Sequence, residues 1–328
     1  MRTASSLSCI TNTPIRVSNI RAKRKSAGLK SQHLYTLKAL ADLFRAKTAG
    51  LELQSREITF EPSDKFIREK IFQIDLKTSG AIGLCLQTLV LVAAFRGKGI
   101  TFHIKGGTCG LGAVPVDYYK YVIFPLLSRF GLSANIEIGR RGYYPKGGGE
   151  VKVEINPIEE PKNILLTQPG KILRIEGMSI ASSLLEQRRV AQRQAESAER
   201  ILKNKFSAPV KIDTEYAQTF SPGTELNLIA HTERGCILWS DARGERGKLA
   251  EKVGEEAAQK LIKEIDSGAA CDFHLADNFI PWLCFLGGSI RTSTVSMHVQ
   301  TNIWVCELFF GKIFEVLGTT ISCQPAKI

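Results

Sequence analysis

The 328-residue sequence contains eight cysteines but no CxxC pair, because they are spread singly from Cys9 to Cys323. With no CxxC pair, and with no signal peptide to direct the chain to an oxidising compartment, the sequence supports neither a cysteine zinc site nor a disulfide framework. We expect the thiols to be reduced and most of them to be small core residues.

Long hydrophobic runs are missing as well. The longest, AIGLCLQTLVLVAAF (81–95), is shorter than the roughly 20 residues that span a bilayer and is interrupted by Gln87 and Thr88. It predicts a buried helix. The N-terminal MRTASSLSCITNTPIRV lacks the continuous apolar stretch of a signal peptide. These absences predict a cytoplasmic protein with no membrane partner.

Acidic residues are the minority among the charged side chains. Lys and Arg number 44 against 32 Asp and Glu, a formal net charge of +12, which favours an anionic partner such as nucleic acid, nucleotide or a membrane surface. Hydrophobic residues make up 44% and charged residues 23%, which excludes a disordered or fibrous chain. The length is typical of two or three domains.

Helical and extended patterns alternate along the chain. A strand (15–20) precedes a helix in which Leu34, Leu37, Leu40 and Phe44 recur at helical spacing, and the strand EITFEP follows. The same order returns with the helix 81–95, the strand ITFHIKGG, a helix over 118–130 and the alternating strand GGEVKVEINP. Repeated units of this kind predict an α/β sandwich with helices on one face of the sheets.

The pattern changes near residue 170. The stretch SLLEQRRVAQRQAESAERILKNKF predicts one long amphipathic helix with Leu184 and Leu185 toward the core. Three strands follow, and then a second helix whose buried stripe comprises Ala250, Val253, Ala257, Leu261 and Ile265. We therefore predict a large domain made of residues 1–169 and 267–328, interrupted by a compact insert over 170–266.

The segment NIRAKRKSAGLKSQHL is the densest functional signal. Arg21, Lys23, Arg24, Lys25 and Lys30 crowd a loop before a helix that should begin near Ser31. Helix N-termini and forked Arg donors both suit phosphate oxygens, so the segment predicts a phosphate site. A solvated basic loop is the alternative.

Three other glycine-rich or basic segments carry weaker signals. In GGTCGLGAVPVDYY, glycines permit close backbone approach to a ligand, and an aromatic near Pro115 can sandwich a base, although the spacing is neither a Rossmann nor a Walker pattern. RRGYYPKGGGEV predicts a tight turn. DARGERGKLAEKVGEEAA predicts a basic turn that enters a helix, with its function open.

His298 is one of only five histidines and lies in HVQTNIWVCELFF, where Thr301 and Asn302 are good N-cap residues. A histidine just upstream of a helix N-terminus can attack phosphorus while the helix end stabilises the phosphate oxygens. The alternative is a capping or packing histidine.

Taken together and in this order, IRAKRKSAGLKSQHL, GGT with AVPVDYY, RGYYPKGGGEV, GERGKLAEKVGEEAA, LADN and HVQTN resemble the RNA 3'-terminal phosphate cyclase family, from Arg2 almost to the C-terminus. The resemblance implies an α+β fold: three repeated units, each with two helices on a four-stranded sheet, and a smaller α/β insert. It implies a ligase in which a histidine takes AMP from ATP and passes it to an RNA 3'-phosphate. The neighbouring 2'-hydroxyl then closes a 2',3'-cyclic phosphate.

The resemblance also assigns residues. His298 matches the nucleotide-accepting histidine. The positions around the phosphates, the RNA end and the adenine are Arg21, Arg24, Gln32, His33, Pro115, Tyr118, His274, Asp277 and Asn278. ATP and magnesium are the implied cofactors, with no metal ligands assigned, and RNA with a 3'-phosphate end is the implied partner.

Some positions depart from the family pattern. The family usually has a strand and a Glu-Gly-Gly-Gly-Gln stretch just before the residues matched by MRTASSLS. Its Asp after Gly-Gly-Thr is Cys109 here, and its Asp-Gln pair is Asp277 and Asn278. One alternative is therefore a non-catalytic RNA-end-binding or ribosome-biogenesis protein, a branch that lacks the histidine. Another is an enolpyruvyl-type transferase with the same repeated architecture.

Overall fold

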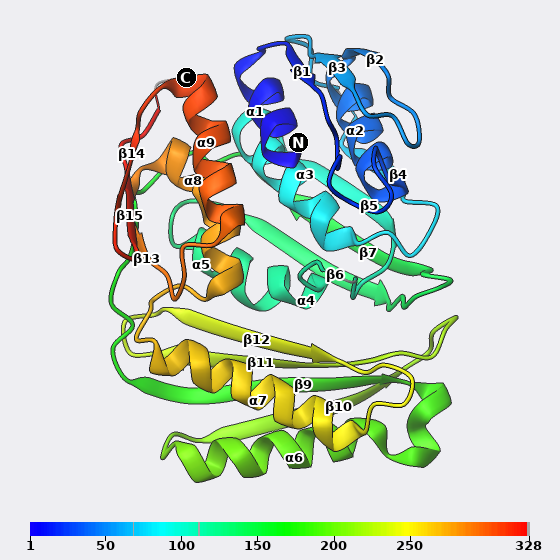
Figure 1. The fold of residues 1–328 in the computed structure, drawn as a ribbon, viewed down its shortest axis with the longest axis vertical. Helices are drawn as coiled ribbons and strands as arrows, with labels where there is room; N and C mark the ends of the chain where they lie inside the picture. The colour runs from blue at the N-terminus through cyan, green and yellow to red at the C-terminus, as the bar shows by residue number, and fades with distance from the viewer. Residues whose placement is uncertain (68, 111, 327–328) are drawn as a thin grey trace.

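The computed structural model describes residues 1–67, 69–110 and 112–326. Figure 1 shows two lobes, the lower one formed by the elements from β9 to α7 and the upper one by the rest of the chain. Helices and mixed sheets alternate throughout, so the predicted α+β class is confirmed. Within the described residues, no helix combines the length and apolarity that crossing a bilayer requires.

The upper lobe begins with a sheet in the order β1-β3-β2. Its elements are α1 (Arg2–Thr11), β1 (Ile15–Val17), α2 (Ser31–Phe44), β2 (Lys47–Ala49) and β3 (Ile58–Glu61). The predicted helix start near Ser31 is confirmed, whereas the helix α1 was not anticipated because its sequence is rich in Ser and Thr, which have weak helix propensity.

The other two sheets of this lobe each have four strands with the same pattern of parallel and antiparallel neighbours. One contains β4 (Ile71–Asp75), β5 (Ile100–Gly106), β7 (Gly149–Ile155) and β6 (Ala134–Arg140), in that spatial order. The other contains β8 (Ile164–Leu166), β13 (Gly288–Arg291), β15 (Thr320–Cys323) and β14 (Phe314–Leu317). In both, the first two strands are parallel and the remaining pairs are antiparallel. The division into three repeated units and the domain boundaries stay predictions.

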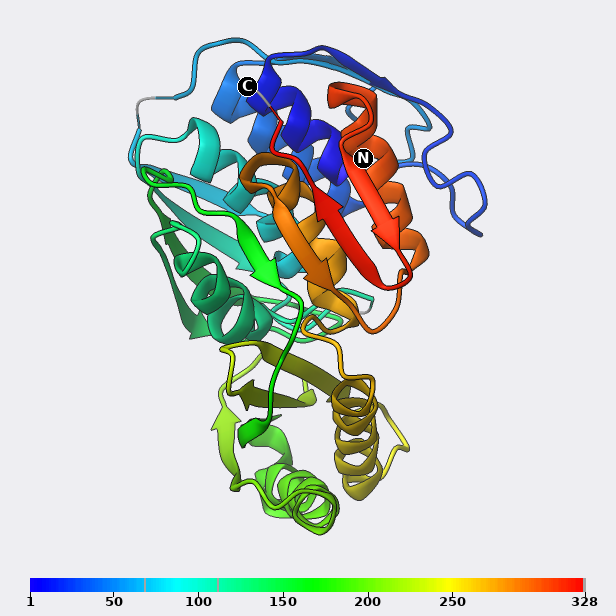
Figure 2. The ribbon, with the colours of Figure 1, turned by 90° about the vertical axis from the view of Figure 1, so that its left-hand side faces the viewer.

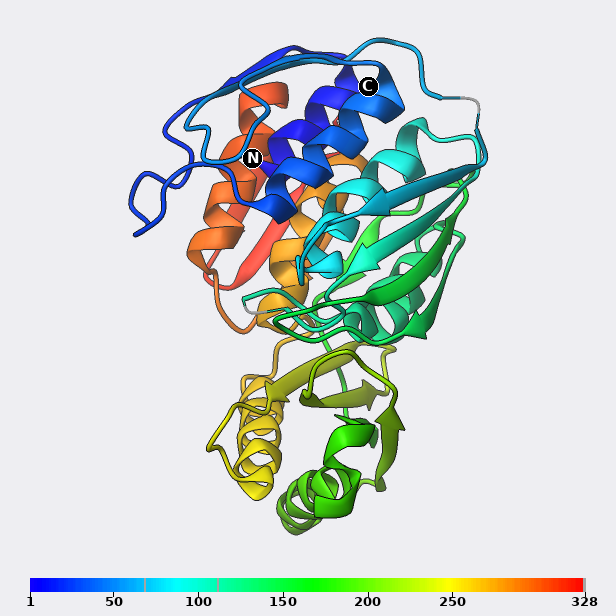
Figure 3. The same cartoon turned by 90° about the vertical axis from the view of Figure 1, so that its right-hand side faces the viewer.

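Four helices pack against one another inside this lobe: α1, α3 (Ile82–Arg96), α8 (Phe273–Leu286) and α9 (Met297–Phe310). Figure 2 and Figure 3 show the sheets outside them. The helix α3 is apolar on nearly every side and is buried from Ile82 to Ala94 apart from Leu84 and Gln87, which confirms the predicted buried helix. Seven of the eight cysteines are buried, as expected for core residues.

The insert is a sheet in the order β10-β9-β11-β12 with two helices on one face (Figure 1). Its elements are β9 (Ile172–Ser182), α6 (Val190–Lys205), β10 (Val210–Ala217), β11 (Thr224–Thr232), β12 (Ile237–Arg243) and α7 (Ala250–Asp266). Along β11, Leu226 and Leu228 belong to the core under α6 and α7, whereas Ile229 belongs to the core of the upper lobe. The second face of this sheet therefore packs on the upper lobe.

Two predicted helices are divided. The long helix of the insert is a short 3-10 helix (Ser183–Arg188) followed by α6, because Arg189 takes a left-handed conformation with φ of 50°. The placement of Leu184 and Leu185 in the core was wrong, since 66% of the Leu184 surface is exposed and Leu185 is only partly buried.

The helix expected over 118–130 is α4 (Val116–Tyr118), a π-helical turn (Tyr119–Ile123) and α5 (Phe124–Ser128). Pro125 has no N–H to donate and its ring crowds the preceding turn. The wider turn, in which the Phe124 N–H reaches the Tyr119 carbonyl, accommodates this.

Candidate active site

A cavity of about 730 Å³ lies between the lobes, and the N-terminal ends of four helices open onto it. Arg2 is the first residue of α1, Gly83 the second of α3, His274 the second of α8 and His298 the second of α9. The aligned peptide dipoles give each helix start a partial positive charge, although Asp272 and Ser296 cap some of the N–H groups of α8 and α9. The convergence of these helix starts favours an anionic ligand in the cavity.

His298 lies inside α9 and not upstream of it. The helix begins at Met297, because the Ser296 hydroxyl accepts a hydrogen bond from the Val299 N–H at 3.2 Å and caps the helix. The expectation that Thr301 and Asn302 are the cap was wrong. The Thr301 hydroxyl donates back to the Met297 carbonyl at 2.7 Å, within the helix. The side chain of His298 is exposed on the cavity wall.

Asp277 occupies the wall beside His298. Its Oδ1 accepts a hydrogen bond from Asn302 Nδ2 at 2.5 Å, and Asn302 in turn accepts one from the Thr3 hydroxyl at 2.6 Å. Burial raises the pKa of the Asp277 carboxyl, opposed by the charges of Arg2, His298 and the neighbouring α8 histidine. The contacts of Asn302 thus connect α8, α9 and α1 at the cavity.

Arg2 lies close to Asp277, with its Nε donating to Gln87 Oε1 at 2.7 Å. Both side chains line the cavity, and neither was singled out from the sequence. Arg2 could have been found from its position at the start of a helix, and Gln87 from being a polar residue within the apolar helix α3.

His274 is held by the cap of α8. Asp272 Oδ1 accepts hydrogen bonds from the N–H groups of His274 and Leu275, both at 2.9 Å. Burial raises the Asp272 pKa to about 7 and lowers the pKa of His274. Asn278, also on the wall, donates to the His274 carbonyl at 2.8 Å.

Pro115 and Tyr118 are buried behind this wall and do not line the cavity, which is bounded there by Ala113 and Val114. The Tyr118 hydroxyl donates to Asp272 Oδ1 at 2.9 Å, and its ring meets the His274 ring edge to face at 6.3 Å. Tyr118 therefore supports His274 from the protein interior.

The insert supplies the opposite wall through the segment DARGERGK. Asp241, Arg243, Lys248 and Lys260 line the cavity, and Glu256 pairs with both lysines, at 2.7 Å for Lys260. The sequence predicted a basic turn here without a function, and the turn was confirmed. Its position at the cavity follows from the packing of the insert on the upper lobe.

Four predicted residues lie outside the cavity lining, on α2 or the loop before it. Arg21 Nη1 donates to the Ser26 and Gly28 carbonyls at 2.5 and 3.2 Å, so it holds its own loop together. Arg24 is exposed. Gln32 Oε1 accepts from the N–H of Ala81, next to α3, at 3.4 Å.

His33 Nδ1 accepts from the Lys30 N–H at 3.3 Å. Burial, together with the charges of Arg2 and Arg21, lowers the pKa of His33 to about 4. Its ring is therefore neutral at physiological pH, and it lies close to the basic loop and to the start of α1.

The side chains do not fit a resident magnesium site. Within residues 1–67, 69–110 and 112–326, no group of three His, Cys, Asp or Glu side chains is arranged to hold a metal ion. The cavity is lined by four carboxylates, Asp241, Glu245, Glu256 and Asp277, of which Asp277 faces Asn302 and Glu256 faces two lysines.

Comparison with known proteins shows which family the chain belongs to. The family model described as RNA 3'-terminal phosphate cyclase matches residues 1–316. A protein of that name from Pyrococcus abyssi is 41% identical over 329 residues, covering 100% of this chain and 94% of the relative. Its namesakes from Thermococcus kodakarensis and Ignicoccus hospitalis are 42% and 38% identical, each covering 97% of this chain and 91% of the relative. The chain belongs to the RNA 3'-terminal phosphate cyclase family.

Proposed function

We propose that this protein is an ATP-dependent ligase that converts an RNA 3'-terminal phosphate into a 2',3'-cyclic phosphate. A ring nitrogen of His298 attacks the α-phosphorus of ATP, so that an N–P bond forms and the bond to pyrophosphate breaks. An oxygen of the RNA 3'-phosphate then displaces the histidine and takes the AMP. The 2'-hydroxyl attacks the activated phosphorus, losing its proton, and AMP leaves.

One observation carries the proposal: the exposed side chain of His298 lies in a cavity onto which four helix N-termini open. Helix N-termini stabilise phosphate oxygens, and the guanidinium groups of Arg2 and Arg243 on the walls add positive charge. The volume of about 730 Å³ falls within the roughly 300–1,000 Å³ typical of small-molecule sites.

The other assigned residues are given roles according to their positions relative to the cavity. His274, Asp277 and Asn278 contact the nucleotide from α8, and Tyr118, with Pro115 nearby, acts behind His274. Arg21, Arg24, Gln32 and His33 serve the RNA end, approached from α2 and its basic loop. Magnesium enters with ATP, and the reaction takes place in the cytoplasm.

The test is the reaction itself. Purified protein is incubated with magnesium, ATP and an oligoribonucleotide that carries a 3'-phosphate and a 5' label. We expect a product that resists phosphatase and appears only with ATP; the same RNA with a 3'-hydroxyl is the control. Binding of the 3'-phosphate RNA without any phosphatase-resistant product would instead favour the non-catalytic RNA-end-binding function.

Arg24→Ala should weaken RNA binding most at low salt. The exposed guanidinium would neutralise one phosphate, so its loss should reduce the slope of log affinity against log salt by about 1. Filter binding across a salt series measures this. The matched control is Arg16→Ala, because Arg16 is exposed but already paired with Glu57 at 3.0 Å. An equal loss of affinity at every salt concentration would mean that Arg24 has only a structural role.

A further inference from the structure

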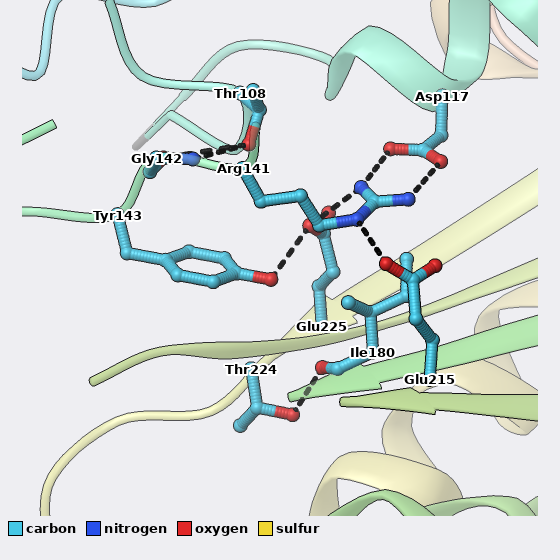
Figure 4. A network of polar contacts seen from close by, with 9 residues as sticks. All are labelled: Thr108, Asp117, Arg141, Gly142, Tyr143, Ile180, Glu215, Thr224 and Glu225. Carbon is cyan, nitrogen blue, oxygen red and sulfur yellow. Dashed lines mark hydrogen bonds and ion pairs between the residues drawn. The ribbon is translucent and has the colours of Figure 1, made fainter. Parts of the chain in front are cut away.

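A buried ion cluster joins the insert to the upper lobe (Figure 4). Arg141 follows β6, and its guanidinium contacts both carboxylate oxygens of Asp117, at 2.8 and 3.0 Å. The same guanidinium lies 3.3 Å from Glu215 on β10 and 3.6 Å from Glu225 on β11. Arg141 and Asp117 come from the upper lobe and both glutamates from the insert, so this one side chain bridges the lobes.

The cluster has more negative than positive groups. Three carboxylates surround one guanidinium, and the side chains of Asp117 and Glu225 are fully buried. Glu225 Oε1 accepts a hydrogen bond from the Tyr143 hydroxyl at 3.1 Å, whereas its Oε2 has no partner among the described residues. An ionised carboxylate in that position would be only partly compensated.

Other titratable groups face Glu225 from the elements packed against it. The Cys109 thiol lies near Glu225, on the loop after β5, and Arg243 is the cross-strand neighbour on β12, with Asp241 near Cys109. Burial, reinforced by the charge of Asp117, raises the pKa of Glu225 to about 7. The carboxyl therefore exchanges its proton near neutral pH.

The cluster adjoins the nucleotide cavity on both sides. Cys109 precedes Gly110, which lines the cavity from the upper lobe, and Arg243 lines it from the insert. The separation of the lobes at the cluster therefore affects the width of the cavity.

We propose that Glu225 is a positioning residue for nucleotide binding: with its proton it lets the insert close on the upper lobe, and without it the uncompensated charge moves the cavity walls apart. The identity of the ligand rests on the proposed function. The proposal concerns a residue that acts through Arg141 and the insert, at a distance from the reacting atoms.

The direction of the pH effect follows from the raised pKa. Because the pKa of Glu225 is raised in the closed form, its protonated carboxyl stabilises closure fully at pH values below the ordinary pKa of 4.5. This stabilisation of the closed form is lost as the pH rises toward about 7, and it stays lost above that value. Closure, and with it nucleotide affinity, should therefore weaken between mildly acidic and neutral pH.

The test compares magnesium-ATP affinity from pH 5 to pH 8 in the wild type and in Glu225→Gln, which keeps the hydrogen-bonding shape without the charge. From pH 5 to pH 8 the wild type should lose up to about a hundredfold more affinity than Glu225→Gln, because each unit of the shift from 4.5 to about 7 corresponds to a factor of about ten and most of the shift falls within this pH range. The ATP phosphates and Asp272 titrate in both proteins, so their effect on affinity cancels when the two pH dependences are compared. Equal pH slopes in the two proteins would overturn the proposal.

Two further variants sharpen the comparison. Glu215→Gln removes a carboxylate that contacts the same guanidinium. Because the Glu215 side chain is 42% exposed, this variant should keep the pH dependence of ATP affinity seen in the wild type. Tyr143→Phe removes the hydroxyl that favours the ionised form of Glu225, so the transition should move to higher pH. An unchanged midpoint in Tyr143→Phe would also contradict the proposal, even if Glu225→Gln does not fold.

A measurement without nucleotide separates this proposal from the proposed function. The urea midpoint of the wild type should fall relative to that of Glu225→Gln as the pH rises from 5 to 8. If that difference appears but no variant binds ATP, the conclusion that Glu225 is protonated at the lobe interface is retained. The proposed function and its link to Glu225 are then both refuted. If ATP binds and neither measurement depends on Glu225, only the positioning role is refuted.

Discussion

His298→Ala should abolish AMP attachment, with a loss of at least about a thousandfold, because no other group can replace an attacking nucleophile. The measurement is incubation with magnesium and ATP labelled in the α-phosphate, followed by denaturing electrophoresis and peptide mapping. Label should be retained on the wild-type peptide that contains His298 and should be lost when RNA with a 3'-phosphate is added.

The fold should survive this substitution, because the His298 side chain is exposed and α9 is capped by Ser296. Circular dichroism and the thermal midpoint check that point. His231→Gln is a matched control, since His231 lies on β11 and pairs with Glu176 at 2.9 Å, outside the cavity lining. Retained label in a folded His298→Ala protein would refute the assignment.

Arg141→Met should lower the free energy of unfolding by about 3–5 kcal/mol, the range found when one partner of a buried ion pair is removed. Methionine fills similar space but leaves the Asp117 carboxylate, which is fully buried, without its two charged hydrogen bonds. Chemical denaturation at neutral pH measures the change.

Glu215→Gln provides the comparison for Arg141→Met, because it removes a partly exposed carboxylate from the same guanidinium. It should cost less than about 1 kcal/mol, as exposed ion pairs do. A similar decrease in the free energy of unfolding in both variants would mean that the cluster is solvated and does not hold the two lobes together.

Local sequence patterns predicted most of the elements around the site. The apolar run over 81–95 forms the buried helix α3, and the alternation in GGEVKVEINP forms β7. These two predictions were confirmed because the spacing of apolar side chains along a short segment shows which of its faces will be buried. The cap of α9 was misplaced by five residues relative to Thr301, since Ser, Thr and Asn are all good caps and only packing selects Ser296.

The site itself was predicted in part. His274, Asp277, Asn278 and His298 were assigned, and the cavity brings all four together. Arg2, Gln87 and the insert residues were missed, because no local pattern relates the start of α1 to α8. Tyr118 was expected at a ligand, and its contact with Asp272 instead depends on a residue 154 positions away.

The sequence by itself determined the α+β class, the buried helix α3 and, through the order of its motifs, the family. These properties follow from side-chain periodicity and from motifs a few residues long, which are present before the chain folds. Only the tertiary structure decided which helix starts share a cavity, which wall the insert supplies and where Arg141 meets three carboxylates. Those arrangements depend on contacts between residues far apart in the chain, and the packing of complete elements sets them.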